Sequence, residues 1–104
     1  MKRYSYVLHP IAQDDLERLY RFLAEAAPES ADKALEHIYD SFTILEITPH
    51  SCRKAASIEG VQLRELIINF GCSGYLALFE IRPDDEVLIL AIKQQRESDY
   101  HWCN

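Results

Sequence analysis

The sequence contains few cysteines, no long apolar run and no signal sequence. Its three cysteines, Cys52, Cys72 and Cys103, form no Cys-x-x-Cys pair, and their odd number argues against a disulfide framework or a zinc site. No apolar run reaches the roughly 18 residues of a membrane span. The N-terminal residues MKRYSYVLHP lack the apolar core and cleavage site of a signal peptide. We therefore expect a protein of the reducing cytoplasm that does not enter a membrane.

Basic charge is also scarce. The net charge is −6, with −4 in residues 1–50 and −2 in residues 51–104. Neither half offers the basic footprint of a nucleic-acid-binding protein, so we expect no direct DNA binding by this chain alone. The four histidines and three cysteines show no spacing typical of a metal site or a catalytic triad. We expect no metal and no cofactor.

The composition is that of one small folded domain. Hydrophobic residues make up 48% of the 104 residues and aromatic residues 11%, which is typical of a globular chain rather than a disordered one. The length allows a single modest core. No internal repeat or low-complexity linker interrupts it. We expect one domain over residues 1–104.

The first half predicts a strand followed by two helices. Residues 4–8 alternate and are rich in β-forming side chains, so they predict a short strand. Pro10 suits the first turn of a helix that runs to about residue 26, and His9 before it is an N-cap candidate. Pro28 breaks that helix. Ser30 is the expected N-cap of a second helix, which ends at Thr48-Pro49.

The second half predicts three antiparallel strands. Residues 49–60 have no clear period and are expected to form a loop, with Arg53 and Lys54 as a local basic pair. Strands are expected near 61–70, 75–82 and 86–93, joined by two short turns. The expected fold is α+β: an N-terminal strand and an antiparallel helical hairpin packed on one face of an antiparallel β-meander.

The predicted sheet is apolar on both faces. In the strand near 75–82, Leu76 and Leu78 lie opposite the apolar set that starts at Tyr75. In the next strand, strict alternation places Leu88, Leu90 and Ile92 on one face and Ala91 on the other. Two helices can cover only one face, and an exposed apolar patch usually marks a binding site. Either a partner covers the other face, or the 49–60 loop and the tail at residues 97–104 do.

Four short motifs occur in an order that resembles the RelE/ParE toxin superfamily of bacterial type II toxin–antitoxin modules. They are Tyr-x-Val-x-x-x-Pro-x-Ala-x-x-Asp-Leu at 4–16, Leu-Arg-Glu-Leu at 63–66, Ser-Gly-Tyr at 73–75 and Ala-Ile-Lys-Gln-Gln-Arg-Glu-Ser-Asp-Tyr at 91–100. The resemblance implies a toxin of a plasmid-stabilisation module in a hetero-oligomer with a cognate ParD-like antitoxin. Such antitoxins carry a ribbon-helix-helix domain and wrap the toxin with a flexible C-terminal segment.

The resemblance also implies a target. ParE-like members inhibit DNA gyrase by protein–protein binding, whereas RelE-like members cleave mRNA in the ribosome and place an arginine directly after Ser-Gly-Tyr. Here that position is Leu76. The chain is therefore closer to ParE, and we expect a gyrase inhibitor rather than an enzyme. The alternatives are a RelE-like ribosome-dependent mRNA endonuclease and an inactive regulatory binding module.

Two sets of residues are candidates for function. A ribonuclease would need clustered cationic groups and a proton-transfer residue, for which this chain offers Arg64, Arg96, Tyr100 and His101. Salt bridges to Glu65, Glu97 or Asp99 are the structural alternative for the two arginines. Tyr100 and Trp102 can instead anchor the tail or serve as interface aromatics. The expected partner-binding residues are Leu76, Leu78, Leu88, Leu90, Arg64, Arg96, Tyr100 and Trp102.

Overall fold

The computed structural model describes residues 3–70 and 73–94. A short strand is followed by helices, and four further strands complete the described chain. The elements are β1 (Ser5–Leu8), α1 (Pro10–Ala26), α2 (Pro28–Ser41), α3 (Thr43–Ile47), the 3-10 turn η1 (Pro49–Ser51), β2 (Arg53–Ile58), β3 (Val61–Phe70), β4 (Ser73–Arg82) and β5 (Glu86–Gln94). The predicted α+β class is confirmed.

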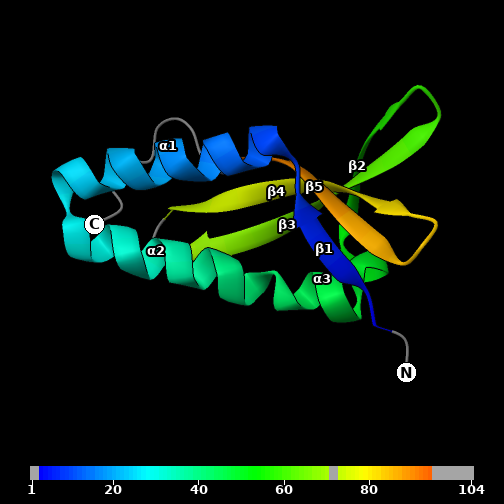
Figure 1. Ribbon diagram of the computed structural model, residues 1–104, viewed down its shortest axis with the longest axis horizontal. Helices are drawn as coiled ribbons and strands as arrows, with labels where there is room; N and C mark the ends of the chain where they lie inside the picture. The colour runs from blue at the N-terminus through cyan, green and yellow to red at the C-terminus, as the bar shows by residue number, and fades with distance from the viewer. Residues whose placement is uncertain (1–2, 71–72, 95–104) are drawn as a thin grey trace.

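The five strands form one mixed sheet in the order β1-β5-β4-β3-β2. The neighbouring pairs from β2 to β5 are antiparallel, as the meander prediction required, while β1 joins the far edge parallel to β5. Helices α1 and α2 lie side by side against one face of the sheet, and the β2–β3 hairpin projects beyond them (Figure 1). We call the face under the helices the helix face and the opposite one the second face.

The helix starts follow the local chemistry. The His9 Nδ1 atom accepts a hydrogen bond from the Ile11 amide at 3.1 Å, and Pro10 occupies the first helical position of α1, so the expected cap is confirmed. The second helix differs from the prediction. It begins at Pro28 itself rather than after Ser30, since proline needs no hydrogen bond there. It also breaks at Phe42, and the remaining turn is α3.

One apolar core joins the helices to the helix face of the sheet. Alanines at 12, 31 and 34 are almost fully buried where α1 and α2 approach each other and the sheet. The larger core side chains come from every layer: Leu16, Leu19, Ile38, Phe42, Leu45, Leu66, Ile68, Tyr75, Phe79, Val87, Ile89 and Ile92. Within the described residues, no helix has the length and apolar character needed to cross a membrane.

The prediction of a loop over residues 49–60 is wrong for its second half. Residues 53–58 form β2, an edge strand that pairs antiparallel with β3 through a two-residue turn at Glu59-Gly60. Both turn residues have positive φ, 52° for Glu59 and 83° for Gly60, as a tight hairpin turn with right-handed strand twist requires. The segment therefore widens the sheet to five strands instead of folding across its second face.

The predicted faces of β5 are wrong beyond Ile89. The register pairs Leu78 with Ala91 and Phe79 with Ile89, so Leu90 is an extra residue in a β-bulge. A bulge shifts the alternation by one position. Ile92 consequently lies on the helix face, where it is 1% exposed, and Ala91 lies on the second face opposite Leu78. Strict alternation instead predicts Ile92 on the second face and Ala91 on the helix face.

Candidate partner-binding site

The second face carries its apolar side chains at the centre of the sheet. The register places Ile67 of β3, Leu76 of β4 and Lys93 of β5 in one row, and Glu65, Leu78 and Ala91 in the next. Leu76 and Leu78 are half-buried, while Ile67 is 42% exposed. Leu63 also belongs to this face by register but is only 4% exposed. The face is thus partly closed at one end and open around Leu76 and Leu78.

A groove of about 550 Å³ follows these rows. We call it the basic groove. Apolar side chains of β4 and β5 line one side, and the exposed edge strand β2 lines the other. Its lining residues are Arg53, Lys54, Ala55, Ala56, Glu65, Leu76, Leu78, Ala91 and Lys93.

Positive charge predominates in the basic groove. Three of its lining residues are cationic and one, Glu65, is acidic. Glu65 is already engaged, because its Oε1 atom accepts a 2.8 Å charge-assisted hydrogen bond from the Arg53 Nε atom. Within residues 3–70 and 73–94, neither Lys54 nor Lys93 forms an ion pair. A chain with a net charge of −6 therefore presents a local basic surface beside an apolar one.

The structure brings only two of the predicted apolar residues into this groove. Leu76 and Leu78 line it, with Lys93 and Ala91 as their cross-strand partners. Leu88 lies further along the sheet, between Glu80 on β4 and Val7 on β1. Leu90 is the bulge residue and does not line the groove. Both are half-buried, so any interface that reaches them extends beyond the groove.

Arg64 lies on the opposite face from the groove. It is paired with Phe79 in the register, and its Nη1 atom donates to the carbonyl oxygens of His50 and Cys52 at 3.2 and 2.8 Å. The predicted salt bridge to Glu65 is wrong, because adjacent residues of a strand point to opposite faces. Glu65 pairs with Arg53 instead. Arg64 thus ties η1 and the start of β2 to β3.

Several predicted site residues cannot be placed. Arg96, Tyr100, His101 and Trp102 lie outside the described residues. Other groove residues escaped the prediction. The sequence shows Arg53 and Lys54 as a basic pair but predicts a loop over residues 53–56. Ala91 escaped because of the bulge at Leu90. Only a signal for a hairpin at Glu59-Gly60 could have placed residues 53–56 beside β3.

Two groups close to the site have a raised pKa. Burial raises the pKa of the Cys52 thiol, and the nearby Arg64 charge partly opposes that effect, so the thiol is held in its protonated, unreactive form. Burial also raises the pKa of Tyr75, whose side chain lies on the helix face behind the groove. In the part of the chain that the structure describes, no three His, Cys, Asp or Glu side chains gather in a metal-binding cluster.

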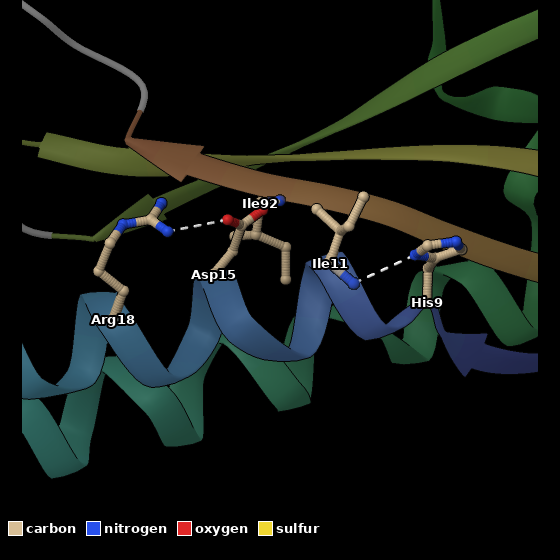
Figure 2. A network of polar contacts seen from close by, with 5 residues as sticks. All are labelled: His9, Ile11, Asp15, Arg18 and Ile92. Atoms are coloured by element: carbon tan, nitrogen blue, oxygen red, sulfur yellow. Dashed lines mark hydrogen bonds and ion pairs between the residues drawn. The ribbon is translucent and has the colours of Figure 1, made fainter.

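A side-chain hydrogen bond joins α1 to the edge of β5. The Oδ2 atom of Asp15 accepts a 2.9 Å hydrogen bond from the Ile92 amide, and its Oδ1 atom accepts one of 2.9 Å from Arg18. Figure 2 shows Asp15 reaching from α1 to β5 with Arg18 beside it on the helix. The tertiary role of Asp15 could not be read from its position in the helix.

Comparison with known proteins identifies the class. Residues 6–99 match the family described as the ParE toxin of the type II toxin–antitoxin system parDE. The chain is 32% identical over 93 residues to Toxin RelE3 of Caulobacter vibrioides, a match that covers 89% of this chain and 96% of that protein. A solved structure described as the chromosomal ParDE TA system from P. aeruginosa superposes with a TM-score of 0.73 at 23% identity, covering 89% of this chain and 97% of the other.

The chain belongs to the ParE toxin family, whose members are the toxin components of type II toxin–antitoxin systems. Membership implies an antitoxin partner. The solved structure supports the same fold.

Proposed function

We propose that this toxin acts by protein–protein binding, that its target is DNA gyrase, and that a ParD-like antitoxin with a ribbon-helix-helix domain neutralises it by covering the second face. The observation that carries the binding proposal is the basic groove. Its apolar residues Leu76 and Leu78 are only half-buried, and Lys93, which forms no ion pair among the described residues, lies beside them. Interfaces use such apolar centres with a charged rim. Gyrase as the target rests on the family alone.

The arrangement of cationic groups supports binding over RNA cleavage. An endonuclease of this superfamily would need basic groups gathered at the point where charge develops on the phosphate. Leu76 occupies the position that an arginine takes in RelE-like enzymes, and Arg64 is held by two carbonyl groups on the helix face. Among the described residues, the cations of the groove lie beside Leu76, Leu78 and Ala91, and its one carboxylate, Glu65, is bound to Arg53.

Three assays on the same induced culture and purified protein test this function. Expression without antitoxin should arrest growth with signs of DNA damage, and the purified toxin should inhibit supercoiling by gyrase. Primer extension should detect no new cleavage of mRNA at ribosomal A-site codons. Codon-specific cleavage with normal supercoiling would replace this proposal with the endonuclease alternative. Absence of toxicity, with antitoxin binding retained, would replace it with the inactive regulatory module.

A matched pair of variants links the assays to the groove. Leu78→Lys places a charge at the groove floor, whereas Ile44→Lys places one on α3 at a side chain that is 43% exposed and does not line the groove. If the second face is the partner-binding surface, only Leu78→Lys should escape neutralisation when the antitoxin is co-expressed. Equal neutralisation of both variants would show that the antitoxin does not bind the second face.

A further inference from the structure

The outer edge of β5 is only partly covered by β1. Strand β1 pairs with Glu86–Ile89 and ends at Leu8, while β5 continues to Gln94. After β1 the chain continues as α1. Asp15 of this helix supplies the acceptor for the Ile92 amide that a neighbouring strand would otherwise supply. Past Asp15, α1 and the last residues of β5 run on together, with no further strand between them in the described chain (Figure 2).

A second groove opens at this place. It has a volume of about 280 Å³ and is lined by Arg18, Leu19, Phe22, Lys93 and Gln94. We call it the edge groove. Phe22 is 64% exposed, the largest exposure among the large hydrophobic side chains of the described residues. Aromatic side chains are enriched at interfaces relative to the rest of a protein surface, so Phe22 is a candidate contact for a partner.

Lys93 lines both grooves. The basic groove on the second face and the edge groove beside α1 therefore meet at Lys93, near the end of β5. A single extended chain could lie over Leu78 and Leu76, pass Lys93 and reach Phe22 without leaving the surface. We call this path the binding track.

Positive charge predominates along the binding track, where the one acidic lining residue, Glu65, is engaged by Arg53. Arg53, Lys54 and Lys93 line its first part, and Lys93 and Arg18 its second. Arg18 is paired with Asp15 and Arg53 with Glu65, which leaves the two lysines without an ion pair among the described residues. Complementary charge is the ordinary means by which an interface selects and orients its partner. The occupant of this track should be acidic.

We infer that one continuous segment of the antitoxin follows the binding track, with aliphatic side chains on Leu76 and Leu78, an acidic side chain at Lys93, and an apolar side chain against Phe22. This inference rests on the proposed function and extends it from the second face around the β5 edge to α1. It predicts that Phe22 on α1 contacts the antitoxin. An antitoxin that covered only the second face would leave Phe22 exposed.

Substitutions along the track test the inference with the antitoxin encoded beside the toxin as the probe. In calorimetric titrations, Phe22→Ala should weaken binding by about 10-fold and Lys93→Glu by about 30-fold or more. The control Lys33→Glu reverses an exposed charge on α2 away from both grooves and should stay within about 2-fold. Unchanged affinity of Phe22→Ala would overturn the inference.

Photo-cross-linking separates this inference from the proposed function. A benzoylphenylalanine is placed at position 22 in one toxin variant and at position 78 in another, and each is irradiated with the antitoxin. Cross-links from both positions to neighbouring residues of one antitoxin segment would support the track. A cross-link at 78 alone, or one from 22 to the toxin's own residues 95–104, would overturn it and leave the second face as the antitoxin site. No antitoxin cross-link at 78, with an antitoxin that binds elsewhere, would overturn both.

Discussion

Asp15 on α1 and Ile92 on β5 are 77 positions apart in the sequence and are joined by a 2.9 Å hydrogen bond from the Ile92 amide to the Asp15 carboxylate. Among the described residues no strand pairs with this edge of β5 beyond β1, and Asp15 supplies an acceptor there while it also holds Arg18 beside the sheet edge. This contact sets how α1 lies along β5. It also places Phe22, seven residues further along the helix, near Lys93.

Loss of the Asp15 carboxylate should loosen this contact. Asp15→Ala leaves the Ile92 amide without its side-chain acceptor and should lower the free energy of unfolding by about 1–3 kcal/mol. Asp15→Asn keeps one acceptor oxygen for the Ile92 amide and loses the ion pair with Arg18, which is exposed, so its effect should be below about 1 kcal/mol. Urea denaturation followed by circular dichroism measures both, with the exposed neighbour variant Asp14→Ala as control. Equal effects of Asp15→Ala and Asp14→Ala would contradict this role.

Truncation of two phenylalanines should change the free energy of unfolding by very different amounts. Phe79 is 0% exposed in the core, whereas Phe22 is 64% exposed on α1. Phe79→Ala removes a buried ring and leaves a cavity, so it should lower the free energy of unfolding by about 3–5 kcal/mol. Phe22→Ala should change it by no more than about 0.5 kcal/mol. Thermal or urea unfolding of the two variants gives the comparison, and a large loss of stability from Phe22→Ala would mean that Phe22 is structural.

Stability should fall at alkaline pH because three tyrosines have raised pKa values. A hydrogen bond to the Asp32 carboxylate, with its charge, raises the pKa of Tyr20, and burial raises the pKa of Tyr6 and Tyr75. Each neutral phenol is favoured in the folded state. The resulting stabilisation is complete below the unfolded pKa of about 10 and is lost as the pH rises through the higher folded pKa.

Urea unfolding between about pH 8 and about pH 11 should show this loss. Tyr75→Phe keeps the ring in the core and removes the titrating hydroxyl, so this variant should lose less stability above about pH 10 than the wild type. Tyr4→Phe, at a tyrosine outside this set, serves as the comparison. Identical pH profiles for Tyr75→Phe and the wild type would show that Tyr75 does not contribute.

The sequence predicts the α+β class and most element boundaries because its local signals agree with the tertiary structure. Pro10 and His9 determine the start of α1, and the turn at Pro83-Asp84-Asp85 separates β4 from β5. The apolar alternation in β4 correctly places Leu76 and Leu78 on the second face. These features depend on neighbouring residues, which a sequence displays directly.

The remaining features depend on contacts between distant residues. The bulge at Leu90 follows from how β5 pairs with β4, and nothing in the run from Val87 to Lys93 distinguishes a bulged strand from a regular one. Strand β2 forms because β3 offers it an edge, although its own sequence carries no clear period. For the same reason the sequence suggested an apolar face but not the basic groove, whose cations come from separate strands.

The proposed function requires that the antitoxin binds in the basic groove on the second face. The most direct test is a calorimetric titration of the antitoxin into the wild-type toxin, Leu78→Lys and Ile44→Lys, each first shown to be folded by circular dichroism. We predict that Leu78→Lys weakens binding by about 30-fold or more, as expected for a residue at the centre of an interface, and that Ile44→Lys binds as the wild type does. Wild-type affinity in Leu78→Lys would contradict the claim.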